Sequence, residues 1–563
     1  MNDIRRTILW VIFGFSLVLL WDKWQIHNGR KPTFFPTPEV TAQAAPADPA
    51  KAGTDVPATA PAATADSSSV PGQSTANSAA AAREKVTVTT DLYRLSFDGE
   101  GGTLIGADLL KYADQDDKSK PFRLFDESAA RVYVAQTGLI GGNYPNHKTV
   151  MTLQPGPREL ADGQNELNVV FESPDQGGLK LVKTWTIKRG NYAIGVKHEV
   201  VNTGTAPVNP QLYLQLTRDG NKPAGESSFY STFTGPAVYT EAKKYHKVDF
   251  SDIEKGKTDG VDKSADNGYV AMVQHYFASA WLLDEGVKRD IYVRKAGNNL
   301  YSVGEITHVG QIESGQRKAI DARLFAGPQI ENTLKAIAPG LELVKDYGWV
   351  TILAKPLYWL LDKLHSYIGN WGWSIVALVL LLKIAFYWLN AKAYSSMAKM
   401  KAINPRIMEM RERLKDKPQQ MQQEMMRIYR EEKVNPMGGC FPIVIQIPVF
   451  MALYWVLLSS VEIRNAPWIG WIHDLSVPDP LFILPIVMTL SSLLQTALNP
   501  APPDPMQAKM MWIMPLMFSV MFFFFPAGLV LYWCTNNLLS IAQQWIINTR
   551  MGVPPQFNLP KFK

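Results

Sequence analysis

The fold is decided by two apolar runs in the stretch KMMWIMPLMFSVMFFFFPAGLVLYWCTNNLLSIAQQWII, residues 509–547. The runs 509–525 and 527–547 are separated only by FPAG at 525–528, in which Pro526 and Gly528 signal a tight turn. Each run has about the twenty residues that are needed to cross the hydrocarbon core of a bilayer. The stretch therefore predicts two adjacent transmembrane helices.

Four further apolar runs could also span a membrane. Three lie in the C-terminal half, at 372–390, 437–459 and 481–498, and the fourth, 8–24, follows Arg5 and Arg6. The small-residue pattern at 42–44 lies too far beyond that run for signal cleavage, so we expect an uncleaved anchor with a cytoplasmic N-terminus. The runs together predict a multi-pass α-helical membrane protein with six spans, five of which form the core bundle.

Between the anchor and the bundle the pattern of apolar residues changes. Residues 36–83 are rich in Ala, Pro, Ser and Thr, a composition that buries too little surface to fold. From about 85 to 340, apolar and polar residues alternate with period two, as in the run 179–187, where Lys183 alone breaks the pattern. This alternation predicts a large antiparallel β sandwich, which the anchor delivers to the periplasm.

These segments give an expected organisation for the whole chain. It comprises an anchor helix (1–25), a disordered linker (26–84), a periplasmic β-sandwich domain (85–340), an interfacial amphipathic helix (341–370), span 2 (371–391), a cytoplasmic basic helical hairpin (392–436), span 3 (437–459), a periplasmic loop (460–480), span 4 (481–498), span 5 (509–525), span 6 (527–547) and a cytoplasmic tail (548–563). The interfacial helix is inferred from apolar residues at helical spacing within 349–368, although packing on the β domain is an alternative for it.

The distribution of charge sets the expected topology. Residues 392–436 carry eleven basic and six acidic side chains, a local net charge of +5, whereas Arg464 is the only basic residue of 460–480. Positively charged loops stay in the cytoplasm. We therefore expect 392–436 in the cytoplasm, 460–480 in the periplasm, and both termini in the cytoplasm.

Lys383 is the sharpest local feature of the spans. It lies near the middle of the apolar run 375–389, where a basic side chain costs about 2.5–3.5 kcal/mol and is usually directed at water or a partner. The other C-terminal spans hold no carboxylate, so we infer a hydrated, positively charged groove, with snorkelling to the interface as the alternative. Polar residues that could line this groove are Gln446, Trp533, Asn536, Ser540, Gln543 and Gln544, with Ser491, Ser492 and Gln495, although each could instead hold helices together.

The basic segment 392–436 has an apolar repeat of its own. Methionines recur at helical spacing before and after Pro418, at Met397, Met400, Met410, Met421 and Met425. The spacing predicts two antiparallel helices with a Met-rich seam, which is either the core of the hairpin or a surface for varied apolar partners. The basic outer face suits anionic lipids or a ribosome.

The sequence contains no recognisable catalytic set. It lacks the motifs GxSxG and HExxH and a phosphate-binding glycine loop, and the histidines of the β domain are widely scattered. Two cysteines, both in apolar stretches, cannot form a disulfide framework or a Cys-based metal site. The net charge of +6 does not indicate nucleic acid as a partner. We expect no enzyme activity, no metal and no cofactor.

Several long motifs resemble the YidC family of membrane insertases. They are residues 394–415 of the hairpin, EKVNP (432–436), GGCFP (438–442), WIHDL (471–475), DPMQ (504–507) and FPAGLVLY (525–532). The resemblance implies a periplasmic β supersandwich similar to sugar-mutarotase folds, no cofactor, and a groove open to cytoplasm and lipid. A groove arginine typical of the family corresponds to Lys383 here, a tyrosine pair to Tyr532 and Trp533, and a groove threonine to Val379.

The resemblance also implies a function. It is that of an insertase and chaperone that inserts, folds and helps to assemble nascent membrane proteins in the bacterial inner membrane, alone or with the Sec translocon. Ribosome or signal recognition components are further possible partners. The alternative is a multi-pass transporter with a periplasmic sugar-binding domain, although a transporter should show an inverted repeat or several midplane charges, and we see neither.

Overall fold

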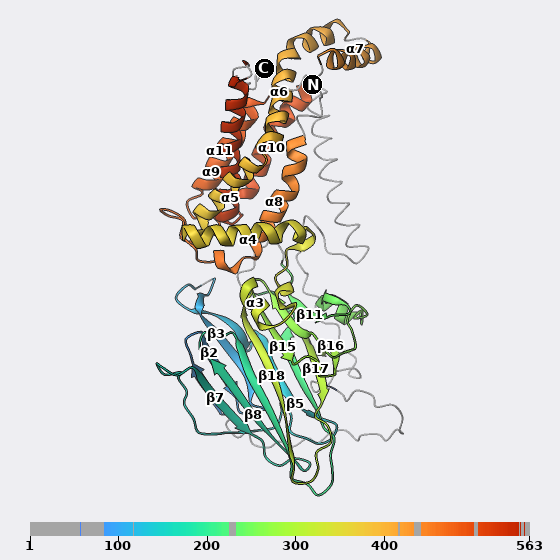
Figure 1. The fold of residues 1–563 in the computed structure, drawn as a ribbon, viewed down its shortest axis with the longest axis vertical. Helices are drawn as coiled ribbons and strands as arrows, with labels where there is room; N and C mark the ends of the chain where they lie inside the picture. The colour runs from blue at the N-terminus through green and yellow to red at the C-terminus, as the bar shows by residue number, and fades with distance from the viewer. Residues whose placement is uncertain are drawn as a thin grey trace. The chain divides into compact units, whose positions relative to one another are not determined.

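A computed structural model describes residues 57, 84–115, 117–223, 232–414, 417–432, 441–499, 505–550, 552 and 557. The expected anchor helix, nearly all of the linker and most of the C-terminal tail lie outside the described residues. The chain divides into two compact units, and the second begins at Asp346. Figure 1 shows the first of these as a β unit and the second as a helical unit.

The β unit is built from two sheets, each of nine strands in the described residues, whose ladders are all antiparallel. In spatial order the first sheet contains β1 (Lys85–Thr89), β2 (Tyr93–Asp98), β3 (Thr103–Ala113), β4 (Pro121–Glu127), β5 (Val132–Ile140), β10 (Gln211–Asp219), β17 (Leu300–His308), β16 (Arg289–Gly297) and β13 (Ser264–Ala265). The second contains β12 (Lys244–Lys247), β11 (Gly235–Thr240), β14 (Tyr269–Gln274), β15 (Phe277–Leu283), β18 (Arg317–Pro328), β9 (Ala193–Asn202), β8 (Leu179–Lys188), β7 (Glu166–Glu172) and β6 (Thr152–Leu153).

The two sheets pack face to face through aromatic side chains. The ring of Phe97 on β2 lies 5.2 Å from that of Trp185 on β8, and Trp185 and Trp281 are fully buried. The Tyr133 hydroxyl, on β5, donates a hydrogen bond to the carbonyl of Met272, on β14. These contacts confirm the antiparallel β domain that the alternation predicts. Short helices α2 (Phe250–Glu254) and α3 (Glu331–Ile337) and the 3-10 turn η1 (Leu341–Val344) complete the unit.

The helical unit contains eight α-helices in its described part. They are α4 (Thr351–Ile368), α5 (Trp371–Ala385), α6 (Tyr387–Arg413), α7 (Pro418–Glu431), α8 (Phe441–Ser459), α9 (Ile483–Leu498), α10 (Pro505–Phe522) and α11 (Ala527–Arg550), with 3-10 turns η2 (Gly348–Val350) and η4 (Val461–Ile463). The tight turn expected at 525–528 does separate α10 from α11. It is held in place because the amides of Ala527 and Gly528 bond the carbonyls of Val477 and Leu475.

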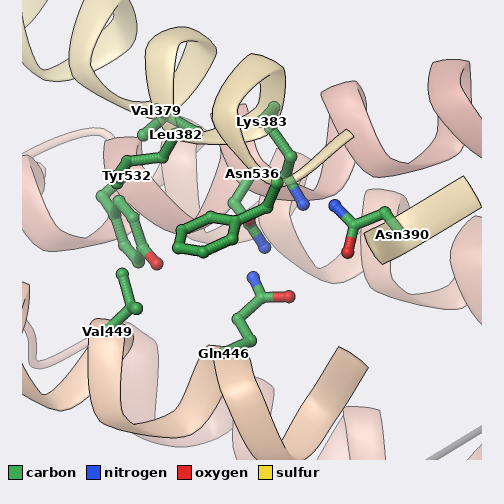
Figure 2. Close-up of a pocket in the computed structure, with 9 residues that line it drawn as sticks. Val379, Leu382, Lys383, Asn390, Gln446, Val449, Tyr532 and Asn536 are labelled. Carbon is green, nitrogen blue, oxygen red and sulfur yellow. The ribbon is translucent and has the colours of Figure 1, made fainter. Parts of the chain in front are cut away.

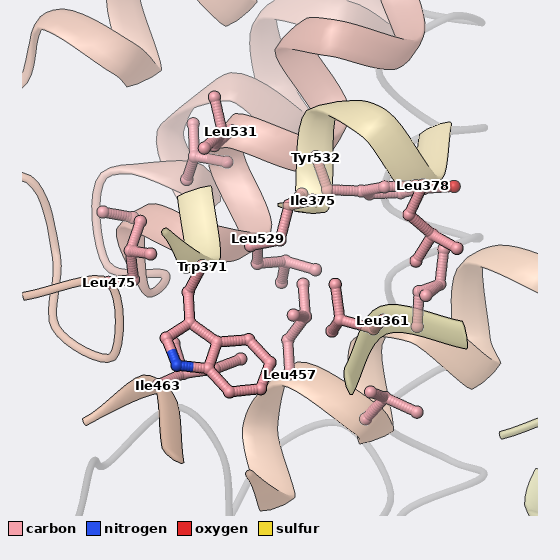
Figure 3. Packing of buried hydrophobic residues seen from close by; sticks show 14 of the residues in the cluster. Leu361, Trp371, Ile375, Leu378, Leu457, Ile463, Leu475, Leu529, Leu531 and Tyr532 are labelled. Carbon is pink, nitrogen blue, oxygen red and sulfur yellow. The ribbon is translucent and has the colours of Figure 1, made fainter. Parts of the chain in front are cut away.

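The core of the helical unit joins α4, α5, α8 and α11. Figure 3 shows Leu361, Trp371, Ile375, Leu457 and Leu529 meeting there, and each is buried. The loop after α8 closes one end of this cluster through Ile463, Ile472 and Leu475. A single apolar core therefore fixes the relative positions of the helices that carry the expected groove residues.

The segment expected as one continuous span, 371–391, is bent in the structure. Helix α5 ends at Ala385, and α6 begins at Tyr387 with its axis turned by 68°. Neither proline nor glycine lies at the bend, so the usual sequence signals of a kink are absent. Lys383 consequently lies in the last turn of α5 rather than at the middle of a long helix.

The lengths of the described helices bear on membrane crossing. None of them is by itself both long and apolar enough for a span, whereas the bent pair α5 and α6 meets the requirement jointly. Shorter apolar helices cover Gln446–Ser459, Ile483–Leu498 and Ala508–Phe522.

Helices α6 and α7 pack against each other over a small apolar cluster of their own. Its buried members are Ile403, Ile407, Met410 and Ile428, and partly buried Met400, Met421 and Met425 pack around them. Arg406 of α6 also forms ion pairs with Glu431 and Glu432 beyond the cluster. The methionines Met400, Met410, Met421 and Met425 therefore belong to the core between the two helices.

Candidate functional site: a polar groove around Lys383

Lys383 points into the helical bundle and forms a hydrogen bond there. Its Nζ donates to Ser540 Oγ of α11 at 2.6 Å. Within the described part of the chain, Lys383 forms no ion pair. The C-terminal end of a helix carries partial negative charge. The position of Lys383 in the last turn of α5 therefore stabilises the charged form of the lysine.

A small cavity of about 40 Å³ lies beside Lys383. Figure 2 shows Gln446 from α8 and Asn536 from α11 extending into the same space, with Asn390 of α6 near the lysine and the Tyr532 ring on the other side. The remaining lining comes from apolar side chains of α5, the α5–α6 bend and α8, namely Val379, Leu382, Phe386 and Val449.

A larger cavity of about 300 Å³ shares Gln446, Tyr532 and Asn536 with the small one. Its other lining residues are Tyr394, Met397, Ile447, Phe450, Gln495, Asn499, Trp533, Asn537 and Ser540. A volume of this size has room for about ten water molecules, and its polar lining supplies partners for them. We call the two cavities together the groove.

Polar side chains in and next to the groove connect α11 to α9. Asn537 donates to Ser491 Oγ and Ser492 Oγ of α9, at 3.2 and 2.9 Å. Gln544 accepts a hydrogen bond of 2.6 Å from Gln495. These bonds hold the two helices together, which is the role that polar residues often have in membrane bundles.

The structure brings together about two thirds of the residues that the sequence placed in the groove. Lys383, Gln446, Tyr532, Trp533, Asn536 and Ser540 line one or both cavities. Gln495, which was also expected, lines the larger cavity, whereas Gln543, Gln544, Ser491 and Ser492 line neither. Gln544 is 2% exposed, and its amide is engaged with α9 and with Asn499. Val379, expected at the position of a family threonine, lines the small cavity.

Several lining residues were not expected from the sequence. Asn390 and Tyr394 lie in the first part of α6 and Asn499 directly follows α9, positions where a polar residue is unremarkable without the fold. Met397 was assigned to the hairpin seam, but it lines the larger cavity instead. The α5–α6 bend accounts for this difference, since it turns the first part of α6 toward α8 and α11.

A second buried polar cluster lies between the sheets of the β unit. Lys183, the break in the apolar alternation, is fully buried, and its Nζ donates to the carbonyls of Gly101 and Thr137 at 2.6 and 2.7 Å. His198 stands opposite Lys183 on β9, and its Nε2 lies 2.9 Å from Thr137 Oγ1. Burial lowers the pKa of Lys183 to about 7 and, with the nearby lysine, that of His198 to about 3.

The described residues contain no group of three or more His, Cys, Asp or Glu side chains that could hold a metal ion. The groove is lined instead by one cation, amides, hydroxyls and aromatic rings. Such a set can bind water, peptide groups and anionic side chains.

Comparison with known proteins identifies the family. Residues 85–360 match the family model of the YidC periplasmic domain, and 363–553 match that of the 60Kd inner membrane protein. Curated relatives from Cupriavidus taiwanensis and Cupriavidus necator, each named membrane protein insertase YidC, are 58% identical over 98% of both chains. The chain belongs to the YidC family of membrane protein insertases. Its β unit is therefore a periplasmic domain, and its helical unit belongs in the inner membrane.

A solved structure of an active YidC insertase is also similar. It covers 81% of this chain and 91% of its own, with 20% identity and a TM-score of 0.39. The relatives give no support to the alternative of a multi-pass transporter.

Proposed function

We propose that this YidC-family chain inserts and folds integral membrane proteins by receiving their polar segments in the groove around Lys383. The observation that carries the proposal is the juxtaposition of Lys383, Gln446 and Asn536 at a cavity between α5, α8 and α11. A polar client segment that crosses dry hydrocarbon loses its hydrogen bonds to water, which costs several kcal/mol per group. A wet groove part-way into the bilayer shortens that dry path.

In this mechanism Lys383 attracts anionic client segments. The ammonium is held by Ser540 and faces no carboxylate among the described residues, so its charge is available to an acidic tail. Meanwhile the client's apolar helix moves into lipid along α10, whose outward side chains such as Leu516, Phe518 and Val520 are exposed. Burial of apolar surface in lipid supplies the driving force.

We propose the topology that the charge distribution predicts. The chain has six spans, with the anchor 1–25 as the first, and both termini are cytoplasmic. Helices α6 and α7 form the cytoplasmic hairpin from about 392 onward, and the loop 460–480 is periplasmic. The bend at Phe386 supports this assignment, because it lets α5 lie in the membrane while the basic part of α6 leaves it.

Helix α4 is proposed to lie in the membrane interface. One of its faces packs on the core through Tyr358 and Leu361, whereas Trp359 is 61% exposed and Ile352 and Tyr367 are 88% exposed. Exposed aromatic side chains are typical of the boundary between lipid and water. Packing on α5 and α8 then holds α4 in this position.

The proposed partners are nascent membrane proteins, the lipid bilayer and, for some clients, the Sec translocon. The basic face of α6 and α7 suits ribosome or signal recognition components that deliver a client. We propose no enzymatic step, and the mechanism needs no cofactor.

The test of this function varies Lys383 and the client together. The purified chain is reconstituted in liposomes, and insertion is measured for a small two-span client whose translocated tail is acidic, neutral or basic. Lys383→Arg should retain insertion of all three, because charge and hydration survive. Lys383→Glu should fail most with the acidic tail, since like charges repel strongly at low dielectric.

Lys383→Leu completes the series, since it removes the charge while leaving an apolar side chain. It should make the bundle more stable but insertion slower, because the groove loses bound water. Normal insertion of the acidic-tailed client by both Lys383→Leu and Lys383→Glu would refute the charged groove.

A further inference from the structure

The larger cavity has a lining whose chemistry differs from that around Lys383. Its polar lining consists of side-chain amides and hydroxyl groups, and no Asp, Glu, Lys or Arg of the described residues lines it. Ile447, Phe450 and Trp533 add an apolar part to the same lining. A lining of amides, hydroxyl groups and apolar side chains cannot select a client by charge. It suits a chemical group that is polar, neutral and present in every client.

Some of the amides in this lining have hydrogen-bonding capacity left over. Asn536 lines both cavities and forms no hydrogen bond with another described residue. Gln495 donates to Gln544, but its Oε1 is buried and has no partner in the described part of the chain. Figure 2 shows the Gln446 amide of α8 beside the Asn536 amide. A buried polar atom without a partner is costly, so Gln495 Oε1 favours a polar occupant, and the partly exposed amides of Gln446 and Asn536 can bind one as well.

A carboxamide is complementary to a peptide group, because each has one carbonyl acceptor and an N–H donor. A client segment that enters the bilayer before folding exposes unpaired peptide groups, and each of them costs several kcal/mol in hydrocarbon. Carboxamides satisfy these groups whatever side chains the client carries. The volume of about 300 Å³ leaves space for a short extended stretch of main chain in place of water.

We propose that the larger cavity binds main-chain peptide groups of the translocating client segment through Gln446, Gln495 and Asn536. The groove then has two subsites with separate tasks. The subsite at Lys383 recognises the charge of client side chains, whereas the carboxamide subsite binds any polypeptide in extended form. This inference rests on the proposed function, and it names the part of the client that the groove recognises.

The test changes the client's main chain and leaves its side chains alone. A neutral-tailed client is translated with two adjacent amide-to-ester replacements in its translocated segment, so that two N–H donors are lost. Insertion rates of the amide and ester clients are compared in liposomes containing the full chain. We expect the ester client to insert roughly fivefold more slowly per hydrogen bond lost.

The variant that removes the subsite is Gln446→Leu/Asn536→Leu. It should slow the amide client and bring the amide-to-ester ratio of rates to that of protein-free liposomes. Asn548→Leu is the matched control, because it makes the same replacement on α11 at a residue that lines neither cavity. It should keep the wild-type ratio. The melting temperatures of all variants in detergent show whether each one is folded.

Three results would overturn the proposal. The first is equal insertion of amide and ester clients by the wild-type chain. The second is an unchanged ratio in a folded Gln446→Leu/Asn536→Leu variant, and the third concerns Lys383→Glu. Lys383→Glu separates this inference from the function itself. It should lose insertion of acidic-tailed clients yet keep the amide-to-ester ratio with neutral tails. Loss of the ratio in Lys383→Glu would mean that the two subsites are one, which also contradicts the proposal.

Discussion

Lys383 Nζ and Ser540 Oγ are joined by a hydrogen bond of 2.6 Å that ties the last turn of α5 to α11. Ser540 sits on the same helix as Asn536 and lines the larger cavity, whereas Lys383 lines the smaller one. The bond therefore connects the two parts of the groove. It also orients Lys383, which is the only cationic residue among the described residues that line either cavity.

Ser540→Ala should weaken the groove without removing its charge. A hydrogen bond to a charged group contributes about 2 kcal/mol, so we expect a lower melting temperature in detergent and a smaller preference for acidic client tails. Ser540→Thr keeps the hydroxyl and should restore both. An unchanged tail preference in Ser540→Ala would show that Lys383 is oriented by other contacts.

Much of the fold could be predicted from the sequence because it rests on local patterns. The alternation in 179–187 directs side chains to opposite faces of a strand, and the structure accordingly buries Trp185 and Ile187. Even the break at Lys183 is informative, since the lysine occupies an inward position and bonds backbone carbonyls there. The high cost of Lys383 in a membrane similarly pointed to the groove.

The remaining features depend on tertiary packing that leaves no local signal. The bend at Phe386 has no proline or glycine, and it moves Met397 from the expected seam to the larger cavity. Gln544 shares a helical face with Ser540, yet the approach of α9 engages its amide in hydrogen bonds. A polar residue in a membrane helix holds two helices together where a second helix packs against it, and it lines a groove where none does.

The proposed topology predicts which exposed residues are accessible from outside the cell. Single cysteines are introduced at Val150, Pro467 and Met408 in a Cys440→Ser/Cys534→Ser background. An impermeant maleimide should label Val150→Cys and Pro467→Cys in intact spheroplasts, and Met408→Cys only after lysis. Labelling of Met408→Cys in intact spheroplasts would place the hairpin outside and invert the topology.

Deletions should separate the contributions of the two units. The β unit has its own core and lies outside the membrane in this topology, so deleting most of 90–320 should leave insertion largely intact. Deleting 397–433 should abolish it, because the deletion removes α7 and most of α6 together with Met397. The activity of both deletion variants is measured by complementation of a strain that is depleted of its own insertase. Equal loss of growth would show that the β unit takes part in insertion.

The buried histidine of the β unit predicts a loss of stability in acid. The pKa of His198 is about 3 in the folded state and about 6.5 when it is exposed. Between these values only the unfolded state binds the proton, so the free energy of unfolding falls as pH decreases from 6.5 toward 3. His198→Gln should flatten this decline. Pulse proteolysis of the full chain in urea, from pH 7 to pH 4, measures it.

The buried Lys183 predicts that stability also depends on pH in the alkaline range. Its pKa is about 7 when folded and 10.5 in its ordinary state, so only the unfolded chain binds the proton between these values. The free energy of unfolding should therefore rise by up to about 1.4 kcal/mol per pH unit from pH 7 toward 10.5. Lys183→Met leaves the carbonyls of Gly101 and Thr137 without their donor, which lowers stability at every pH, but it should abolish the rise. A rise that persists in Lys183→Met would show that another group titrates in this range.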